Sequence, residues 1–352
     1  MNDLMVEEKI IQNEVDSPVQ PYSYKNHPIY DKPFKPAWWL HSRHLQCIWP
    51  TYFRKNKTLK TRHERFELID GDFIDAEWVG PKSGPIVVVL HGLEGSIEST
   101  YANAILHAIE KTGWRALFIH FRNCSTSRNR LDRFYHIGDT GDIMNVLSII
   151  RNREPSVPLA GVGFSLGGNV LLKWLGEMKQ NCPLVAGAAI SVPFKLAVAS
   201  EMTTKGIAKY YQNMLLHAMK KAIHKKFHDR KHPPIDLAKA MQASTFRDFD
   251  DAVTAPLHGF NDAGEYYQKS SSCYYISGIR KPTLVISALD DPLVPPEAIP
   301  ARSEFSDSTT VEIHPRGGHI GFVGGNIPGL AEYWLEDRII HYLKNFLPYK
   351  HQ

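Results

Sequence analysis

A serine between two glycines is the first feature of the sequence that could do chemistry. Residues 163–167 have the sequence GFSLG. The serine directly follows the apolar run 159–164, which is typical of a buried strand. In a G-x-S-x-G pattern the glycines allow a tight turn from a strand into a helix, where larger side chains would clash. The segment 169–175, NVLLKWL, is compatible with that helix. The pattern therefore predicts Ser165 as a nucleophile at a strand-to-helix turn.

A serine hydroxyl needs a base, and the base needs an acid, to react at neutral pH. The apolar run 283–289 leads directly into Asp290 and Asp291, which places carboxylates at the carboxyl end of a predicted strand. We predict Asp291 as the acid, with Asp290 as the alternative. His319 lies in a glycine-containing loop after the last predicted strand, and we prefer it as the general base over His314, which belongs to that strand. The chain order is then Ser, Asp, His.

Two backbone N–H groups are predicted to form an oxyanion hole, which stabilises the negative charge that develops on an attacked carbonyl. Leu166 directly follows the nucleophile and begins the predicted helix, so its N–H is the first donor. The loop 91–95, HGLEG, follows the apolar run 85–90. We expect Leu93 in this loop to supply the second donor.

The elements that position these residues are predicted from a repeated alternation of apolar runs and longer amphipathic segments. A period-two pattern on both sides of a D-G pair, within residues 65–78, predicts an opening β-hairpin. The apolar runs that follow are typical of strands covered on both faces. Together they predict an α/β fold with a mostly parallel central sheet and helices on both faces, which binds ligands at the carboxyl ends of its strands. The runs are residues 85–90, 116–121, 159–164, 185–192, 283–289 and 310–314.

The segment between the predicted strands 185–192 and 283–289 is far longer than one crossover requires. We predict a helical lid insertion there, at about residues 195–275. Its first half, 199–232, has helical spacing and many lysines. The basic face is interpreted either as a solvated surface or as a surface that meets anionic lipid head groups.

The composition predicts one globular domain, residues 34–352, after a flexible N-terminal segment, residues 1–33. The chain has 352 residues, of which 43% are hydrophobic and 22% charged, enough for a substantial core. A tryptophan-rich stretch, 36–50, is predicted to pack on the domain as a structural clasp, and its alternative role is to line an apolar substrate channel.

Several other function classes find no support in the sequence. The net charge is only +4 and the positive residues are spread along the chain, so nucleic-acid binding is not expected. No nucleotide-binding glycine motif is present. His224, His228 and His232 have metal-compatible spacing, but most of their neighbours are lysines, which disfavour a bound cation. We therefore expect neither a metal nor an organic cofactor.

The cellular setting is predicted from the cysteines and the N-terminus. The four cysteines lie far apart without a C-x-x-C pair, which favours free thiols in a reducing compartment. The first 20 residues lack the basic and apolar stretches of a secretory signal, and no run of eighteen apolar residues occurs. These features predict a cytoplasmic protein, with peripheral membrane contact left open.

Several motifs outside the serine, aspartate and histidine segments occur together along most of the chain. Residues 121–125, FRNCS, and 135–139, YHIGD, look like the Arg-Gly-Cys-Ser-Gly loop and the downstream Tyr-His-x-Gly segment of a known group. The chain thus resembles the YheT-like branch of the α/β-hydrolase superfamily, the AB hydrolase 4 family, from about residue 44 almost to its C-terminus. Asn123 and Thr126 stand where that branch usually has glycines. Further matches are residues 259–260, residues 265–267 and Ser271.

This resemblance implies an esterase-like serine hydrolase with the fold of that superfamily. It implies that Ser165, Asp291 and His319 form the catalytic triad, without a metal or organic cofactor. The resemblance adds little about the substrate: relatives are associated with medium-chain acyl esters, with phospholipids or with alcohol acyl transfer, so we expect a small-molecule or lipid-like carboxylic ester with a medium-chain acyl or lipid-like group. An alcohol acyltransferase with the same triad and a catalytically silent binding protein are the alternatives. Three further residues carry over as structural or substrate-pocket residues: Arg122, Tyr135 and His136.

Overall fold

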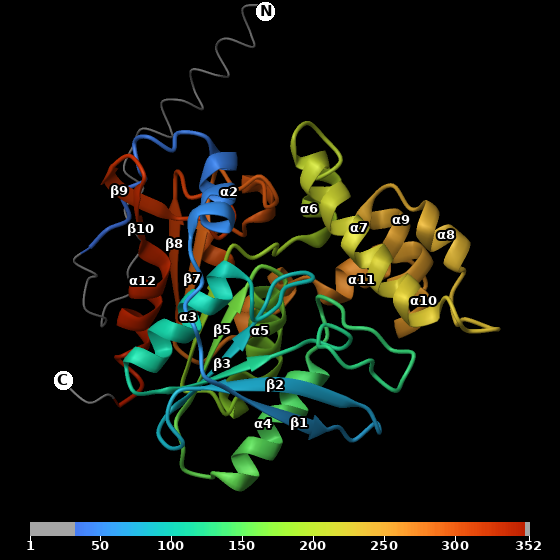
Figure 1. The fold of residues 1–352 in the computed structure, drawn as a ribbon, viewed down its shortest axis with the longest axis horizontal. Coiled ribbons are helices and arrows are strands. Elements are labelled where there is room, and N and C mark those ends of the chain that lie inside the picture. Colours follow the sequence, from blue (N-terminus) through green and yellow to red (C-terminus); the bar gives the residue numbers. More distant parts are fainter. Residues whose placement is uncertain (1–31, 349–352) are drawn as a thin grey trace, which may run out of the picture.

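The centre of the molecule is an eight-stranded, mostly parallel sheet (Figure 1), seen in a computed structural model that describes residues 32–348. The strand order is β1-β2-β4-β3-β5-β6-β7-β8, in which β2 runs antiparallel to its neighbours β1 and β4 and all other pairs are parallel. Every predicted run of the sheet forms a strand, with ends shifted by a few residues. The strands are β1 (Thr61–Glu67), β2 (Phe73–Val79), β3 (Ile86–Leu90), β4 (Arg115–Ile119), β5 (Leu159–Phe164), β6 (Ala186–Ile190), β7 (Thr283–Ala288) and β8 (Thr309–His314).

Helices cover both faces of the sheet because the side chains of each central strand alternate between two apolar layers. In β3, Val88 and Leu90 belong to one buried cluster, whereas Val87 and Val89 belong to another. The first cluster includes residues of α4 and α5, and the second includes residues of α3 and α12. These helices are α3 (Thr100–Lys111), α4 (Gly141–Arg153), α5 (Leu166–Met178) and α12 (Trp334–Leu343).

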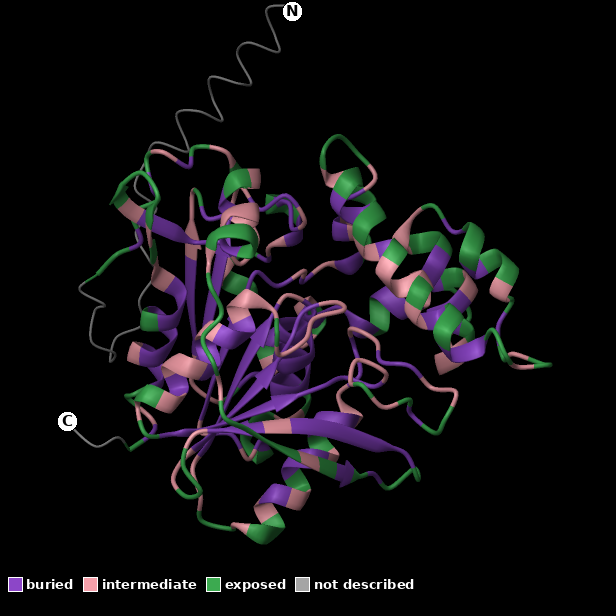
Figure 2. Cartoon of the chain, viewed as in Figure 1, coloured by how far each residue is buried: buried purple, intermediate pink, exposed green. Residues whose placement is uncertain are grey.

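Six α-helices lie between β6 and β7, within residues 195–275, and we call this segment the helical insertion. They gather on one side of the sheet (Figure 1), and their surfaces alternate between buried and exposed residues, unlike the buried central strands (Figure 2). The longest, α7, has 20 residues. No helix within residues 32–348 is long and apolar enough to cross a membrane. The six are α6 (Leu196–Met202), α7 (Ala208–Phe227), α8 (Leu237–Gln242), α9 (Phe246–Phe249), α10 (Ala255–His258) and α11 (Ala263–Ser270).

The tryptophan-rich stretch packs against a hairpin that the sequence analysis did not predict, β9 (Val323–Ile327) with β10 (Leu330–Tyr333). The indole N–H groups of Trp38 and Trp39 donate to backbone carbonyls of this hairpin at 3.0 and 3.1 Å. Trp49, on α2 (Arg43–Phe53), packs edge-on against Trp39. The stretch therefore packs on the domain as a clasp would, and Cys47 and Pro50 within it also line a pocket. The predicted flexible segment 1–33 lies, except for its last two residues, outside the described part of the chain.

Candidate active site

Ser165 occupies the turn between β5 and α5 in a backbone conformation that side chains rarely adopt, with φ 50° and ψ −115°. The neighbouring glycines make this turn possible. A Cβ on Gly163 would lie 2.4 Å from the Gly167 carbonyl oxygen, and a Cβ on Gly167 would lie 2.4 Å from the Leu90 carbonyl oxygen. The close approach of α5 to both β5 and β3 thus requires glycine at these two positions and fixes where the serine hydroxyl is presented.

His319 and Asp291 are brought together by the loops that follow β8 and β7. His319 Nδ1 lies 2.7 Å from Asp291 Oδ2. The other oxygen of this buried carboxylate accepts the backbone N–H groups of Leu293 and Val294, at 2.8 and 3.1 Å. Because its remaining acceptors are fixed by the backbone, the carboxylate holds the imidazole in one orientation with Nδ1 as the donor.

Three side chains from distant parts of the chain hold the backbone of the histidine loop. The successive N–H groups of residues 318–320 donate to Asp290 Oδ1 at 2.8 Å, to the Cys47 sulfur at 2.9 Å and to Ser191 Oγ at 3.1 Å. Asp290, the alternative acid, therefore binds the loop backbone instead of the imidazole. The sequence analysis assigned no role to Cys47 or Ser191. Ser191 directly follows β6, so its place at a strand's carboxyl end was a signal, whereas Cys47 had none.

The loop 91–95 after β3 is positioned by a buried histidine. The imidazole of His91 donates from Nδ1 to the Gly92 carbonyl at 2.6 Å and accepts the Phe121 N–H on Nε2 at 3.2 Å. Burial lowers the pKa of His91 to about 3, so the ring stays neutral and both contacts persist at neutral pH. This histidine fixes the loop to the strand beside it.

Leu93 carries the one N–H of residues 92–95 that donates to no other atom of the described chain. Leu166, the first residue of α5, has an N–H without a partner inside its helix. Both residues line the same pocket as Ser165. The neighbouring N–H groups are satisfied by the Tyr101 hydroxyl for Gly92 (2.9 Å), the Tyr135 hydroxyl for Glu94 (3.0 Å) and the Gly92 carbonyl for Gly95 (3.0 Å).

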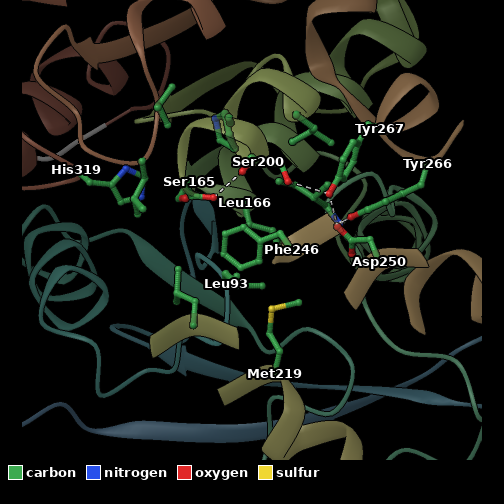
Figure 3. A pocket seen from close by; sticks show the side chains of 18 residues that line it. Leu93, Ser165, Leu166, Ser200, Met219, Phe246, Asp250, Tyr266, Tyr267 and His319 are labelled. Atoms are coloured by element: carbon green, nitrogen blue, oxygen red, sulfur yellow. Dashed lines mark hydrogen bonds between the residues drawn. The ribbon is translucent and has the colours of Figure 1, made fainter. Parts of the chain in front are cut away.

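The pocket that contains Ser165 and His319 lies between the sheet and the helical insertion (Figure 3). It holds about 730 Å³ of space, including open solvent at its mouth. Most of its lining is apolar and comes from both parts of the molecule, including Pro193, Leu196, Leu215, Met219, Phe246 and Leu293.

A second pocket reaches Ser165 and His319 from another direction. It is lined by α2, the start of α3, the loop 91–95 and the N-terminal half of α7. The hydroxyl of Tyr211 on α7 lies 3.1 Å from Nδ1 of His44 on α2, which links the two helices beside this pocket. The serine thus lies where an apolar pocket and a more polar pocket meet.

The remaining residues singled out in the sequence lie away from Ser165 or support its surroundings. Arg122 is buried and pairs with Asp142, Asp72 and Asp70, which is a structural role. Tyr135 holds the loop 91–95 through Glu94, and His136 lines a pocket next to the first one. His224 and His228 stack at 5.0 Å, but no three metal-ligating side chains gather within residues 32–348. The four cysteines are unpaired.

Comparison with known proteins shows the family to which this chain belongs. The profile of the family described as "alpha/beta hydrolase fold" matches residues 85–325, which include Ser165, Asp291 and His319. The chain belongs to the α/β-hydrolase fold family. Within this family it is 37% identical over 314 residues to YheT of Escherichia coli (strain K12), a protein named as an esterase, with 87% of this chain and 92% of YheT covered.

More distant relatives are similar to this chain along most of its length. Human phospholipase ABHD3 is 24% identical over 316 residues, which cover 87% of this chain and 77% of that protein. Monoacylglycerol lipase of Saccharomyces cerevisiae is 28% identical over 271 residues, 74% of this chain and 59% of that one. A solved structure of the esterase Pf2001 from Pyrococcus furiosus superposes with a TM-score of 0.56 at 17% identity, covering 84% of this chain and 96% of that one, a likeness of fold.

Proposed function

We propose that this α/β hydrolase is a serine esterase that cleaves carboxylic esters through an acyl-enzyme on Ser165. The observation that carries the proposal is that Ser165, the Asp291-bound His319, Leu93 and Leu166 line one pocket. A nucleophile, a base held by an acid, and two donors for a developing oxyanion are the parts that acyl transfer requires. The names of the relatives as esterase, phospholipase and lipase agree with it.

The proposed reaction has two halves. Ser165 Oγ attacks the ester carbonyl while His319 Nε2 takes the hydroxyl proton, and the N–H groups of Leu93 and Leu166 bind the oxyanion. The C–O bond to the alcohol then breaks as His319 returns the proton to the leaving oxygen. Water, deprotonated by the same imidazole, attacks the acyl-enzyme and releases the acid. Asp291 stabilises the imidazolium in both halves, and no metal or organic cofactor takes part.

The two pockets suggest where the acyl and alcohol parts of a substrate bind. The apolar pocket beneath the helical insertion suits a medium-length or lipid-like acyl chain, because its lining offers leucine, methionine and phenylalanine side chains. The second pocket suits the alcohol, since it is lined in part by Thr51, Glu94 and Ser99. In this arrangement the helical insertion acts as the lid of the acyl site.

The test is a Ser165→Ala variant, with Ser148→Ala on the exposed face of α4 as its matched control. Loss of both p-nitrophenyl octanoate turnover and fluorophosphonate labelling in Ser165→Ala alone supports the proposal. Labelling that persists in Ser165→Ala overturns it. Products analysed with added ethanol separate the alternatives: free acid is the expected product, and a predominance of ethyl ester identifies an acyltransferase instead.

The same proposal includes contact of α7 with an anionic lipid surface. Ile207, Tyr210 and Met214 are 60%, 68% and 54% exposed at the N-terminal half of this helix, and Met214 also lines the second pocket. Residues 202–228 contain six lysines and no acidic residue. An apolar patch beside the pocket, on a segment of one charge sign, suits a membrane that supplies lipid-like substrates.

A further inference from the structure

The apolar pocket has a polar wall on the side away from His319. Ser200 on α6, Tyr267 on α11 and Asp250 between α9 and α10 all line this pocket. In Figure 3, Tyr267 and Asp250 lie on the opposite side of the view from the imidazole of His319, and Ser200 lies between these two sides. The Ser200 and Tyr267 hydroxyl oxygens are 3.1 Å apart, and the Tyr267 hydroxyl lies 2.8 Å from Asp250 Oδ2.

The direction of these hydrogen bonds decides what the wall can bind. When Asp250 is ionised, the Tyr267 hydroxyl donates its one proton to this carboxylate, so the Ser200 hydroxyl donates to Tyr267. This leaves the lone pairs of Ser200 Oγ available. Each Asp250 oxygen accepts one hydrogen bond, the second from Thr254 Oγ1 at 2.6 Å, and can accept another. The wall therefore presents acceptors to the pocket.

A structural role explains the bonds within this cluster but not its place in the pocket surface. Burying a carboxyl group is costly, and burial raises the pKa of Asp250 to about 7. The residue is carried on a π-helical turn, Asp250–Thr254, and such turns are frequent at functional sites. A carboxyl that only tied helices together could lie inside the insertion, away from the ligand space. Here it lines that space.

We propose that Ser200, Tyr267 and Asp250 form a recognition site for a hydroxyl group on the acyl chain. The preferred substrates are then esters of hydroxylated acids, with an apolar stretch between the carbonyl carbon at Ser165 and the hydroxyl at this wall. The inference rests on the proposed esterase function and on the acyl chain occupying this pocket. A hydrogen bond to a charged or strongly polar partner is worth about ten- to hundred-fold in preference for the hydroxylated chain.

The experiment compares kcat/KM for p-nitrophenyl hexanoate, octanoate and decanoate with that for their ω-hydroxy counterparts. We expect the wild-type protein to prefer the hydroxylated ester at one chain length by about ten- to hundred-fold. Asp250→Asn and Ser200→Ala should bring this ratio close to one while plain esters are still cleaved. The matched control is Asp236→Asn, which removes a carboxylate outside the pocket at the N-terminus of α8 and keeps a good cap.

The outcomes separate this inference from the proposed function. A wild-type ratio at or below one at all three lengths, with plain esters cleaved, overturns the recognition site and leaves the esterase intact. Absence of all ester cleavage overturns both. A purely structural role predicts that Asp250→Asn lowers both rates equally and leaves the ratio unchanged. Ser200→Ala gives the same test if Asp250→Asn does not fold, because Ser200 is only partly buried.

Discussion

His319 Nδ1 lies 2.7 Å from Oδ2 of Asp291, so the imidazole is bound by the second of two adjacent carboxylates. The first, Asp290, accepts the N–H of Gly318 one residue before the histidine. One aspartate therefore orients the ring, and the other shapes the loop that carries it. Substitutions at these two adjacent aspartates, the predicted acid and its alternative, should therefore have different effects.

We predict that Asp291→Asn and Asp290→Asn differ strongly in kcat. Asn at 291 keeps the shape of the side chain but cannot stabilise an imidazolium, and a change of this kind lowers kcat by about 10⁴-fold in a serine triad. Asn at 290 retains an oxygen that can accept the Gly318 N–H, so the loss should stay within about tenfold. Steady-state kinetics with p-nitrophenyl octanoate measure both. Equal losses would contradict the assignment of the acid to Asp291.

The loop that carries Leu93 gives a second prediction. Tyr101→Phe removes the hydroxyl that accepts the Gly92 N–H at 2.9 Å, which frees the residue next to the expected oxyanion donor. Loss of one such support should lower kcat by about tenfold with little change in KM, because the oxyanion forms only after binding. Tyr274→Phe, at an exposed tyrosine, is the control. A rise in KM at constant kcat would place Tyr101 in substrate binding instead.

Buried histidines predict how stability depends on pH. Burial lowers the folded-state pKa of His91 to about 3, of His136 to about 4 and of His258 to about 3, from the ordinary histidine pKa of about 6.5. Below about pH 6.5 the unfolded chain takes up protons that the folded protein does not. The free energy of unfolding should therefore fall as the pH is lowered from about 6.5 to 4, by up to about 1.4 kcal/mol per pH unit for each histidine. Urea unfolding at several pH values measures it.

The matched variant for this prediction is His258→Gln, which removes a histidine whose Nε2 is buried without a partner among the described residues. Its free energy of unfolding should fall less steeply over the same pH window than that of the wild-type protein. An unchanged slope would mean that His258 is not a source of the acid sensitivity.

Asp250 should change the pH dependence of stability in the opposite direction to the histidines. Burial raises its pKa in the folded protein from 3.8 to about 7, so the unfolded chain loses this proton at a lower pH than the folded protein does. The carboxyl therefore destabilises the fold progressively as the pH rises from about 4 to 7. Asp250→Asn has no such titration, so its stability relative to wild type should increase over this window and then level off. A constant difference in urea unfolding from pH 4 to 8 would contradict this, and Asp236→Asn is the control.

The parts of the site that follow local patterns could be predicted from the sequence. The strands of the sheet were recognisable as apolar runs. Ser165 lies at a turn where any side chain larger than glycine on either side would clash with the backbone. Asp291 and His319 were singled out because each follows a predicted strand. These predictions needed only neighbouring residues, and the parallel sheet then brings the carboxyl ends of distant strands to one edge.

The parts that depend on contacts across the chain could not be predicted. Cys47 meets the backbone of His319 although 272 residues separate them, and no local pattern reports such a contact. The polar wall combines residues from three separate elements of the helical insertion, each unremarkable in its own segment. The β9–β10 hairpin was missed because β9 reads VGGNI, in which the glycines break the alternation of a strand.

The exposed patch on α7 gives the last prediction. Replacing Ile207 and Tyr210 together by serine removes two large apolar side chains that are 60% and 68% exposed, and each would lose up to about 1.5 to 3 kcal/mol of burial in a membrane. The affinity of the double variant for vesicles containing phosphatidylserine, measured by co-sedimentation, should fall by tenfold or more. Pure phosphatidylcholine vesicles should bind the wild-type protein less, because they offer the lysines no anionic head groups.

The control is Ile69→Ser, at a residue 91% exposed in the β1–β2 turn, which should leave binding unchanged. Equal binding by the double variant, or equal binding to both vesicle types, would exclude α7 as the contact, because the apolar and the basic residues of this helix are both required by the proposed surface.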